Sequence, residues 1–243
     1  ANIKSPVAFL TQNTDMGKNI LLAAKKNQIK NLINLSSSCV YPRNINIPLE
    51  EEIILTGELE PTNEAYAIGK IHTQKLCQYI NQEDNSYLYK TLIPCNLFGR
   101  YDNFNLETGH LLPNIINKIN IAKQNKEQEV LIWGDGSVRR EFMYTSDLID
   151  CLFYSIYNFH NLPFVMNVGI GHDYSVLDYY KTVAEAFSWN GNFKFDLSKP
   201  VGQQQKLVST SKLNKFGWQS KTSLKKAIKE TINFFSEGNN NVI

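Results

Sequence analysis

The sequence of 243 residues has few cysteines, no long apolar run and no excess of one charge. Its four cysteines stand singly, without a Cys-x-x-Cys pair, which argues against a zinc site or a disulfide framework and fits a reducing cytosol. No apolar segment approaches the length of a membrane span, and the first residues lack the basic and apolar regions of a signal peptide. The formal net charge is only +2 with acids and bases interspersed, so no basic patch indicates nucleic acid or a membrane surface. We therefore expect a cytoplasmic protein without a metal site and without nucleic-acid or membrane partners.

The chain also lacks the glycine-rich turn with which a dinucleotide-binding sheet begins. Such a sheet opens with a strand, a Gly-x-x-Gly-x-x-Gly turn and a helix whose backbone amides receive the pyrophosphate. The nearest match, at Gly169 and Gly171, has no glycine three residues later and is typical of an ordinary turn at a strand end. We therefore expect the chain to begin about halfway through a dinucleotide-binding domain.

The segments that are present alternate between helical and strand-like patterns. Residues 12–27 read as an amphipathic helix whose apolar stripe is formed by Ile20, Leu21 and Ala24. Strands alternating with helices of ten or more residues predict parallel βαβ units, and hence an α/β fold with a doubly wound Rossmann-type sheet that is incomplete at its N-terminal side. The remaining predicted helices are 63–80, 111–125, 145–159, 175–187 with Ser175 as its cap, and 223–235; the predicted strands are 31–36, 87–93, 129–133 and 164–168.

The first chemical motif is a tyrosine and a lysine on one predicted helix. Tyr66 and Lys70 are one turn apart, so both side chains can point into the same pocket. A nearby ammonium favours the phenolate, so we expect the pKa of Tyr66 to be lowered and the phenol to act as a general acid or base. The spacing alone is common on helix surfaces. Here, however, it follows an apolar strand that ends in a loop bearing the hydroxyl of Ser37 and the thiol of Cys39.

A strand, a serine loop and a Tyr-x-x-x-Lys helix in this order resemble the extended, sugar-nucleotide-modifying branch of the short-chain dehydrogenase/reductase superfamily. Further blocks narrow the resemblance to the GDP-L-fucose synthase family, the 3,5-epimerase/4-reductases of GDP-4-keto-6-deoxymannose, and it runs through nearly the whole chain. These blocks are Ser-Ser-Cys-Val-Tyr-Pro at 37–42, Pro-Cys-Asn-Leu-Phe-Gly at 94–99, Asp-Asn-Phe-Asn at 102–105, Gly-His-Leu-Leu-Pro at 109–113, Trp-Gly-Asp-Gly at 133–136 and Arg-Arg-Glu-Phe at 139–142.

The resemblance implies a role for each matching residue. Ser37 would hydrogen-bond the 4-keto oxygen of the sugar, and Tyr66 would donate a proton to it. Lys70 would hold the nicotinamide ribose of NADP(H), while Cys39 and His110 would be the base and acid for epimerisation at C3 and C5. The implied cofactor contacts are Tyr66, Lys70, Pro94, Asn96, Leu97 and His110, and the implied GDP-sugar contacts are Asn96, Lys118, Trp133 and Arg140.

This chemistry is physically reasonable for a ketone-bearing sugar. The 4-keto group acidifies the protons at C3 and C5, so a thiolate and an imidazolium on opposite faces can remove and return a proton and invert the centre. The enolate formed on the way carries charge on the 4-oxygen, where Ser37 and Tyr66 would stabilise it. Free cysteine titrates near about 8.5 and histidine near about 6.5, so modest shifts suit both groups to proton transfer at neutral pH.

Three functional interpretations stay open. The first is an NADP-dependent epimerase/reductase of a GDP-4-keto-6-deoxy sugar. The second is a relative that only epimerises, or only reduces, another GDP-4-keto sugar such as a heptose. The third is an inactive, truncated chain that binds a GDP-sugar or a partner. Many family members have arginine at the position of Lys118, and Arg100, Tyr101 and Asn105 also depart from the family pattern, which leaves the sugar undetermined.

The resemblance also implies a domain organisation and an oligomer. Residues 1–99 and 141–172 would form the C-terminal part of the dinucleotide-binding domain, and residues 100–140 and 173–243 a smaller α/β domain that binds the GDP-sugar. Family members pair two helices to form homodimers, so we expect a homodimer here.

Overall fold

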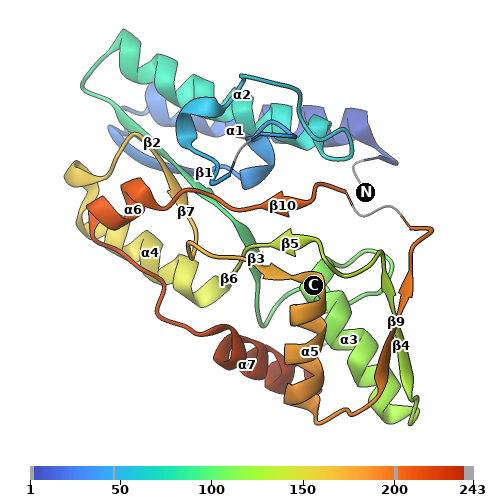
Figure 1. Ribbon diagram of the computed structural model, residues 1–243. Coiled ribbons are helices and arrows are strands. Elements are labelled where there is room, and N and C mark those ends of the chain that lie inside the picture. Colours follow the sequence, from blue (N-terminus) through green and yellow to red (C-terminus); the bar gives the residue numbers. More distant parts are fainter. Residues whose placement is uncertain (1–2, 46, 200–201, 238–243) are drawn as a thin grey trace. The chain divides into compact units, whose positions relative to one another are not determined.

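The structure is a computed structural model that describes residues 3–45, 47–199 and 202–237 (Figure 1). The chain divides into two compact units, each formed by three segments. The first unit comprises Ala1–Asn96, Asp150–Gly171 and Leu207–Gln219, and the second comprises Leu97–Ile149, His172–Lys206 and Ser220–Ile243. No helix in the described part of the chain is both long and apolar enough to cross a bilayer.

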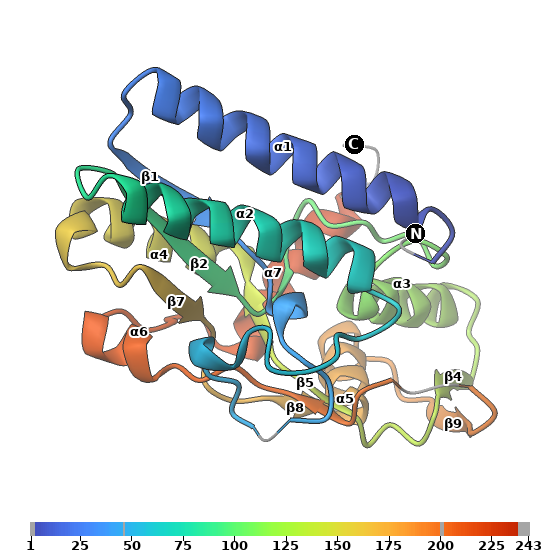
Figure 2. The same cartoon turned by 90° about the horizontal axis from the view of Figure 1, so that it is seen from above.

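A parallel three-stranded sheet lies at the centre of the first unit. Its strand order is β1 (Asn31–Leu35), β2 (Leu88–Pro94) and β7 (Val165–Val168). The middle strand β2 is buried at every position after its first residue, as expected for a parallel strand whose two faces are both covered. Figure 2 shows α1 (Pro6–Lys26) and α2 (Glu64–Glu83) side by side over these strands. The α/β fold with parallel Rossmann-type strands, predicted from the alternation of segments, is therefore confirmed.

Helices α1 and α2 approach each other closely because a glycine lies at their contact. A Cβ built on Gly17 would lie 1.9 Å from the hydroxyl oxygen of Thr73, so α1 can pack against α2 only without a side chain there. The apolar stripe predicted for this helix is correct for Leu21, which is buried, but wrong for Ile20, which is 56% exposed. The helix also begins earlier than predicted, because Pro6 is well suited to the first helical position.

The second unit is built from short strand pairs packed against helices. β4 (Glu129–Trp133) runs parallel to β9 (Asn192–Asp196), β5 (Arg139–Arg140) lies between β10 (Gln205–Lys206) and β8 (Tyr174–Ser175), and β3 (Asn96–Phe98) pairs with β6 (Phe142–Tyr144). One hydrophobic core joins these strands to α3 (Leu111–Gln124), α5 (Val176–Phe187) and α7 (Leu224–Ser236). Its fully buried members include Leu112, Ile115, Ile116, Ile119, Ile132, Tyr179, Val183 and Ile228.

Residues 207–219 belong to the first unit, whereas the sequence had suggested that they lie in the second. The reason is a pair of long-range backbone hydrogen bonds: Leu49 N–H donates to the carbonyl of Leu207 at 2.8 Å, and Ser209 N–H donates to the carbonyl of Leu49 at 2.8 Å. This pairing carries α6 (Ser211–Phe216) into the first unit. The first unit also takes part of α4 (Thr145–Tyr157), from residue 150 onward.

The cap predicted for helix α5 is confirmed and forms a full capping box. The hydroxyl of Ser175 accepts a hydrogen bond from the backbone N–H of Asp178 at 3.1 Å. The carboxylate of Asp178 in turn accepts from the backbone N–H of Ser175 at 3.0 Å and from its hydroxyl at 2.6 Å. The same bonds hold the pKa of Asp178 below its ordinary value.

We expect Ser175→Ala to lower the free energy of unfolding by about 0.5–2 kcal/mol, because a first-turn amide and the Asp178 carboxylate both lose a partner. Ser175→Asn keeps an acceptor at the cap and is expected to retain most of the stability. Urea denaturation followed by circular dichroism measures both variants. Equal losses in Ala and Asn would show that the cap does not stabilise the helix.

Candidate active site

The chain leaves β1 through a serine-rich loop at the carboxyl end of the strand. Ser36 N–H donates to the carbonyl of Leu92 at 2.8 Å and so continues the pairing with β2 by one residue. Ser37 then caps the short 3-10 turn Ser38–Val40, with its hydroxyl oxygen 3.3 Å from the backbone nitrogen of Cys39. The hydroxyl and the thiol are therefore held within one tight turn, at the edge of a parallel sheet where ligands commonly bind.

Helix α2 brings the predicted tyrosine and lysine to this loop. The ammonium of Lys70 donates to the carbonyl of Leu35, the last residue of β1, at 3.1 Å, and it lies 5.7 Å from the centre of the Tyr66 ring. The Tyr66 side chain forms a hydrogen bond with Ser37 and lies within electrostatic range of Cys39. The first unit therefore brings together four of the five predicted catalytic residues.

The predicted lowering of the Tyr66 pKa is wrong. Burial of the phenol raises the pKa of Tyr66, the charge of Cys39 raises it further, and only the hydrogen bond with Ser37 acts in the opposite direction. Lys70 does not contribute, because its ammonium is held by the Leu35 carbonyl and burial lowers the pKa of Lys70 itself. Tyr66 therefore keeps its proton at neutral pH, which suits a proton donor better than a proton acceptor.

The end of β2 supplies two more predicted residues at the same sheet edge. Pro94 is the last residue of β2 and lies opposite Val168 of β7, and the half-buried Asn96 follows it at the start of β3. Because parallel strands end on the same side, this segment and the Ser37 loop share the carboxyl edge of the sheet. The edge contains one unsatisfied group: within the described residues, the buried hydroxyl of Ser36 has no hydrogen-bond partner. Leu97 falls in the second unit.

In the second unit, a cavity of about 360 Å³ takes in three of the predicted GDP-sugar contacts, namely Lys118, Trp133 and Arg140. Among the described residues, two cations, an indole and the Tyr180 phenol line it and no carboxylate does. Such a lining favours an anionic ligand that carries a flat ring. The remaining lining residues are Leu106, Leu111, Asn114, Ile132, Gly136, Val138 and Val176.

The cations of this cavity are held by polar groups around an exposed indole. The ammonium of Lys118 lies 3.5 Å from the carbonyl oxygen of Leu131, 3.5 Å from the Tyr180 hydroxyl and 5.6 Å from the centre of the Trp133 ring. Burial lowers the pKa of Lys118. Trp133 is 60% exposed, so it is a surface group at the cavity and not part of the core. One nitrogen of Arg140 donates to the carbonyl of Arg139 at 2.8 Å.

His110 lies at the N-cap position of α3, but its side chain does not cap the helix. The preceding Gly109 is enclosed by the folded Asp-Asn-Phe-Asn block, because a Cβ there would lie 2.2 Å from the carbonyl oxygen of Asn103. The carboxylate of Asp102 is near enough to feel the charge of His110, although burial is the larger effect and raises the pKa of Asp102. His110 does not line the 360 Å³ cavity, so within this unit it is separate from the predicted GDP-sugar contacts.

Two polar residues of this cavity, Asn114 and Tyr180, were missed by sequence reasoning. Asn114 lies one turn before Lys118 on the same helix face, so its position could have been found by counting along the predicted helix. Tyr180 comes from α5, and only the long-range packing of α5 against α3 brings it to Lys118. No local sequence signal predicts that contact.

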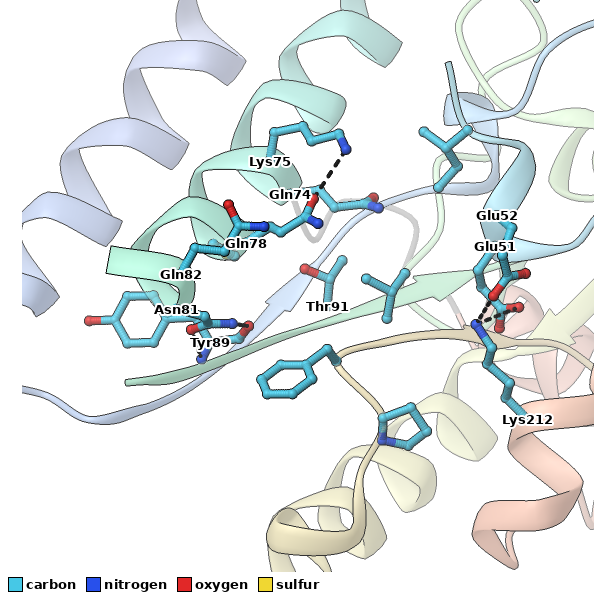
Figure 3. Close-up of a pocket in the computed structure, with 15 residues that line it drawn as sticks. Glu51, Glu52, Gln74, Lys75, Gln78, Asn81, Gln82, Tyr89, Thr91 and Lys212 are labelled. Carbon is cyan, nitrogen blue, oxygen red and sulfur yellow. Dashed lines mark hydrogen bonds and ion pairs between the residues drawn. The ribbon is translucent and has the colours of Figure 1, made fainter. Parts of the chain in front are cut away.

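A larger cavity of about 630 Å³ lies in the first unit, away from every predicted site residue (Figure 3). Several of its polar side chains are bonded to one another or to the backbone, whereas the buried Oε1 of Gln74 has no partner among the described residues. Lys212 forms ion pairs with Glu51 at 3.4 Å and Glu52 at 2.5 Å, and the amide of Asn81 makes two hydrogen bonds with the backbone of Tyr89. We therefore assign no chemistry to this cavity.

Comparison with known proteins places these two sets of residues in context. Residues 1–169 match the family described as "NAD dependent epimerase/dehydratase family". The chain is 50% identical over 241 residues to the GDP-L-colitose synthase of Yersinia pseudotuberculosis, covering 99% of this chain and 78% of that protein. It is 44% identical over 239 residues to the GDP-L-fucose synthase of Azorhizobium caulinodans, covering 98% of this chain and 76% of that protein.

Solved structures show the same likeness. The structure of a GDP-L-fucose synthetase from Naegleria fowleri bound to NADP has a TM-score of 0.89 and 32% identity, covering 98% of this chain and 75% of that chain. A GDP-6-OMe-4-keto-L-xylo-heptose reductase from Campylobacter jejuni also has a TM-score of 0.89, with 26% identity, covering 98% of this chain and 79% of that chain.

We expect iodoacetamide to modify Cys39 first, because it is partly exposed whereas Cys77, Cys95 and Cys151 are buried. Burial raises the pKa of Cys77 and of Cys151 to about 12, which lowers their thiolate fraction at pH 8 by roughly a thousandfold relative to the ordinary value of 9.0. Mass spectrometry of the digested protein should find one label per chain at early times. Labelling of Cys77 as fast as Cys39 would show that the buried sites open readily.

Proposed function

Because the chain belongs to the NAD dependent epimerase/dehydratase family, we propose that it is an NADP-dependent enzyme that epimerises a GDP-4-keto-6-deoxy sugar at C3 and C5 and reduces it at C4. The observation that carries this proposal is the cluster of Ser37, Cys39, Tyr66 and Lys70 at the carboxyl edge of the sheet. The names of the relatives support the substrate class, since both curated relatives at 44–50% identity are synthases of GDP-sugars.

The residues at the sheet edge fit NADP(H). An ammonium has three N–H donors. Lys70 uses one of them on the carbonyl of Leu35, and the other two can bind ribose hydroxyls. The buried, unpaired hydroxyl of Ser36 at the same edge is a second group that a polar ligand would satisfy. When bound, NADPH supplies the hydride for C4. We assign its contacts to Tyr66, Lys70, Pro94, Asn96, Leu97 and His110.

The proton chemistry follows from the surroundings of Tyr66. Ser37 and Tyr66 are hydrogen-bonded to each other, so a ligand oxygen that replaces this mutual bond can accept from both hydroxyls. We assign this position to the 4-oxygen of the sugar, where the two donors stabilise the enolate that forms during epimerisation. Since burial raises the pKa of Tyr66, the phenol holds its proton until the 4-oxygen becomes basic enough to take it.

Epimerisation also needs a base and an acid at C3 and C5, and we assign these roles to Cys39 and His110. Cys39 is held beside the Ser37 hydroxyl by the 3-10 turn, within electrostatic range of Tyr66. His110 lies within electrostatic range of the carboxylate of Asp102, and an imidazole is a common proton donor in enzymes.

We assign the GDP part of the substrate to the 360 Å³ cavity, with an additional contact from Asn96. The guanidinium of Arg140 can hold two phosphate oxygens at once, and Lys118 adds a second positive charge. Trp133 offers an exposed aromatic face. The absence of a carboxylate from this lining makes the cavity suitable for a diphosphate.

A second candidate function is the epimerisation or C4 reduction of a GDP-4-keto-heptose. It is favoured by the likeness to the Campylobacter jejuni heptose reductase at 26% identity. Both functions use the same five catalytic residues, so product identification with each GDP-keto sugar separates them. Titrating NADPH into the purified protein tests the alternative of a chain that binds a GDP-sugar without turnover, because tight binding of the reduced cofactor would argue against it.

We expect the chain to exchange the C3 and C5 protons of GDP-4-keto-6-deoxymannose with deuterium from heavy water, and to oxidise NADPH with this substrate. Cys39→Ser should slow exchange at one centre by about 100-fold or more, and Tyr66→Phe should slow NADPH oxidation by a similar factor. Mass spectrometry and absorbance at 340 nm measure the two steps. Cys151→Ala is the control, because Cys151 is buried in α4 away from these groups.

Two outcomes would contradict this assignment. A wild-type chain that neither exchanges protons nor oxidises NADPH with any GDP-4-keto sugar would overturn the proposed function. If Cys39→Ser exchanged protons at the wild-type rate, the proposed function would still hold, but Cys39 would have no role in the epimerisation.

We also propose that the protein is a cytoplasmic homodimer that pairs through α1 and α2. The absence of a Cys-x-x-Cys pair among four singly placed cysteines supports a reducing compartment. Exposed large apolar side chains on the two helices support pairing, because a second chain could cover them. These are Val7 (74%), Met16 (54%) and Ile20 (56%) on α1, and Ile68 (42%) and Tyr79 (53%) on α2.

We expect the double variant Met16→Glu with Ile20→Glu to be monomeric. The two side chains are one turn apart on α1, so the variant places two charges on the surface that the dimer would bury. Analytical ultracentrifugation of the wild type should give twice the monomer mass. Leu197→Glu is the control, because Leu197 is 75% exposed and lies in the second unit. A wild type that sediments as a monomer at micromolar concentration would refute the dimer.

A further inference from the structure

Two lysine ammonium groups lie near the ring of Trp133, and the proposed function uses only one of them. The ammonium nitrogens of Lys118 and Lys199 are each 5.6 Å from the centre of the Trp133 ring. Because both distances refer to one point, the two nitrogens are at most 11.2 Å apart, twice that distance. Lys118 lines the 360 Å³ cavity, and Trp133 is 60% exposed beside it. Lys199 is thus a second cation at the same indole.

The backbone holds Lys199 at this place. Asp196, the last residue of β9, lies opposite Trp133 in the parallel β4–β9 pair, and its carbonyl accepts from Gly134 N–H at 2.8 Å. The Asp196 carboxylate closes a turn by accepting from the N–H of Ser198 at 3.1 Å and from its hydroxyl at 2.6 Å. Lys199 N–H then points to the carbonyl of Asp196 at 3.4 Å. The position of Lys199 is therefore tied to the strand pair that carries Trp133.

The charges around this indole are unbalanced. Asp196 is close enough for Lys199 to help lower its pKa, but the larger causes are its bonds with Ser198, which occupy one carboxylate oxygen. No aspartate or glutamate lines the neighbouring cavity. Two ammonium groups attracted to one ring repel each other, and an anionic group that contacts both relieves that repulsion. The ligand that best suits the pair carries at least two negative charges.

Gly202, in the connection between β9 and β10, lies close to a third cation, Arg140. A Cβ built on Gly202 would be 3.7 Å from a terminal nitrogen of Arg140. The connection between β9 and β10 is therefore beside Trp133 at Lys199 and beside Arg140 at Gly202. Both of these side chains are assigned above to the GDP part of the substrate.

We propose that Lys199 is a further substrate-binding residue, whose ammonium converges with that of Lys118 at Trp133 to bind the diphosphate of the nucleotide sugar. This inference rests on the proposed function, because it takes a nucleoside diphosphate sugar as the ligand of the cavity. It predicts that affinity depends on Lys199 only when the ligand carries phosphate. A role limited to holding Trp133 in place would affect phosphorylated and unphosphorylated ligands alike.

The test compares binding of GDP and of guanosine to the full chain by isothermal titration calorimetry. Lys199→Gln should raise the Kd for GDP by about tenfold and leave the Kd for guanosine unchanged, since one charge-assisted contact is lost. Lys199→Arg keeps the charge and should bind GDP within about threefold of the wild type. Lys194→Gln is the matched control on β9, because Lys194 is exposed and pairs with Glu129 at 2.6 Å outside the cavity.

The outcomes separate this inference from the proposed function. The inference would be overturned if Lys199→Gln left the affinity for GDP unchanged, or if it weakened the binding of GDP and of guanosine equally. The proposed function would still hold in either case, provided that the wild type turns over a GDP-4-keto sugar. A wild type that binds neither GDP nor a GDP-sugar would overturn both. Loss of GDP affinity alone, with recovery in Lys199→Arg, is the result that supports Lys199 as a phosphate contact.

Discussion

The hydrogen bond from Lys70 to the carbonyl of Leu35 is the contact on which the site of the first unit depends. It joins the helix that carries Tyr66 to the last residue of the strand that leads into the serine loop. With this bond fixing the rotation of α2, the side chain one turn earlier faces Ser37, and the hydrogen bond between Ser37 and Tyr66 follows. The same bond explains why the lysine does not lower the pKa of its tyrosine: the ammonium is directed to the main chain of β1.

Local patterns predicted the parts of this structure that depend on neighbouring residues. The helix that carries Tyr66 and Lys70, the cap at Ser175 and the parallel strands were all correct, because spacing, capping and burial pattern are local quantities. Long-range contacts were not predicted. Nothing near Leu207 indicates that it pairs with Leu49, and nothing near Tyr180 indicates that it meets Lys118. The predicted direction of the Tyr66 pKa shift was wrong for a related reason, because spacing indicates that a charge is near but not how deeply the phenol is buried.

The two units carry chemically different groups, and the difference matches the two ends of the proposed substrate. The first unit presents hydroxyls, a thiol and a phenol that burial keeps protonated, which are groups for moving protons at a ketone. The second unit presents cations, an indole and no carboxylate in its cavity, which are groups for holding a nucleotide. Lys118 offers a compact charge without the planar fork of an arginine, and the ammonium of Lys199 is a second cation at the same Trp133 ring.

The close contact of Gly17 with Thr73 couples α1 to the helix that carries Tyr66 and Lys70, although α1 bears none of the assigned groups. Thr73 lies on α2 three residues beyond Lys70, so a bulkier residue at position 17 pushes on the segment that sets the phenol and the ammonium. Natural variation should therefore be scarce at this glycine and plentiful at its solvent-facing neighbours on α1. A screen of random variants for impaired turnover with an intact fold would recover changes at position 17, far along the chain from any reacting atom.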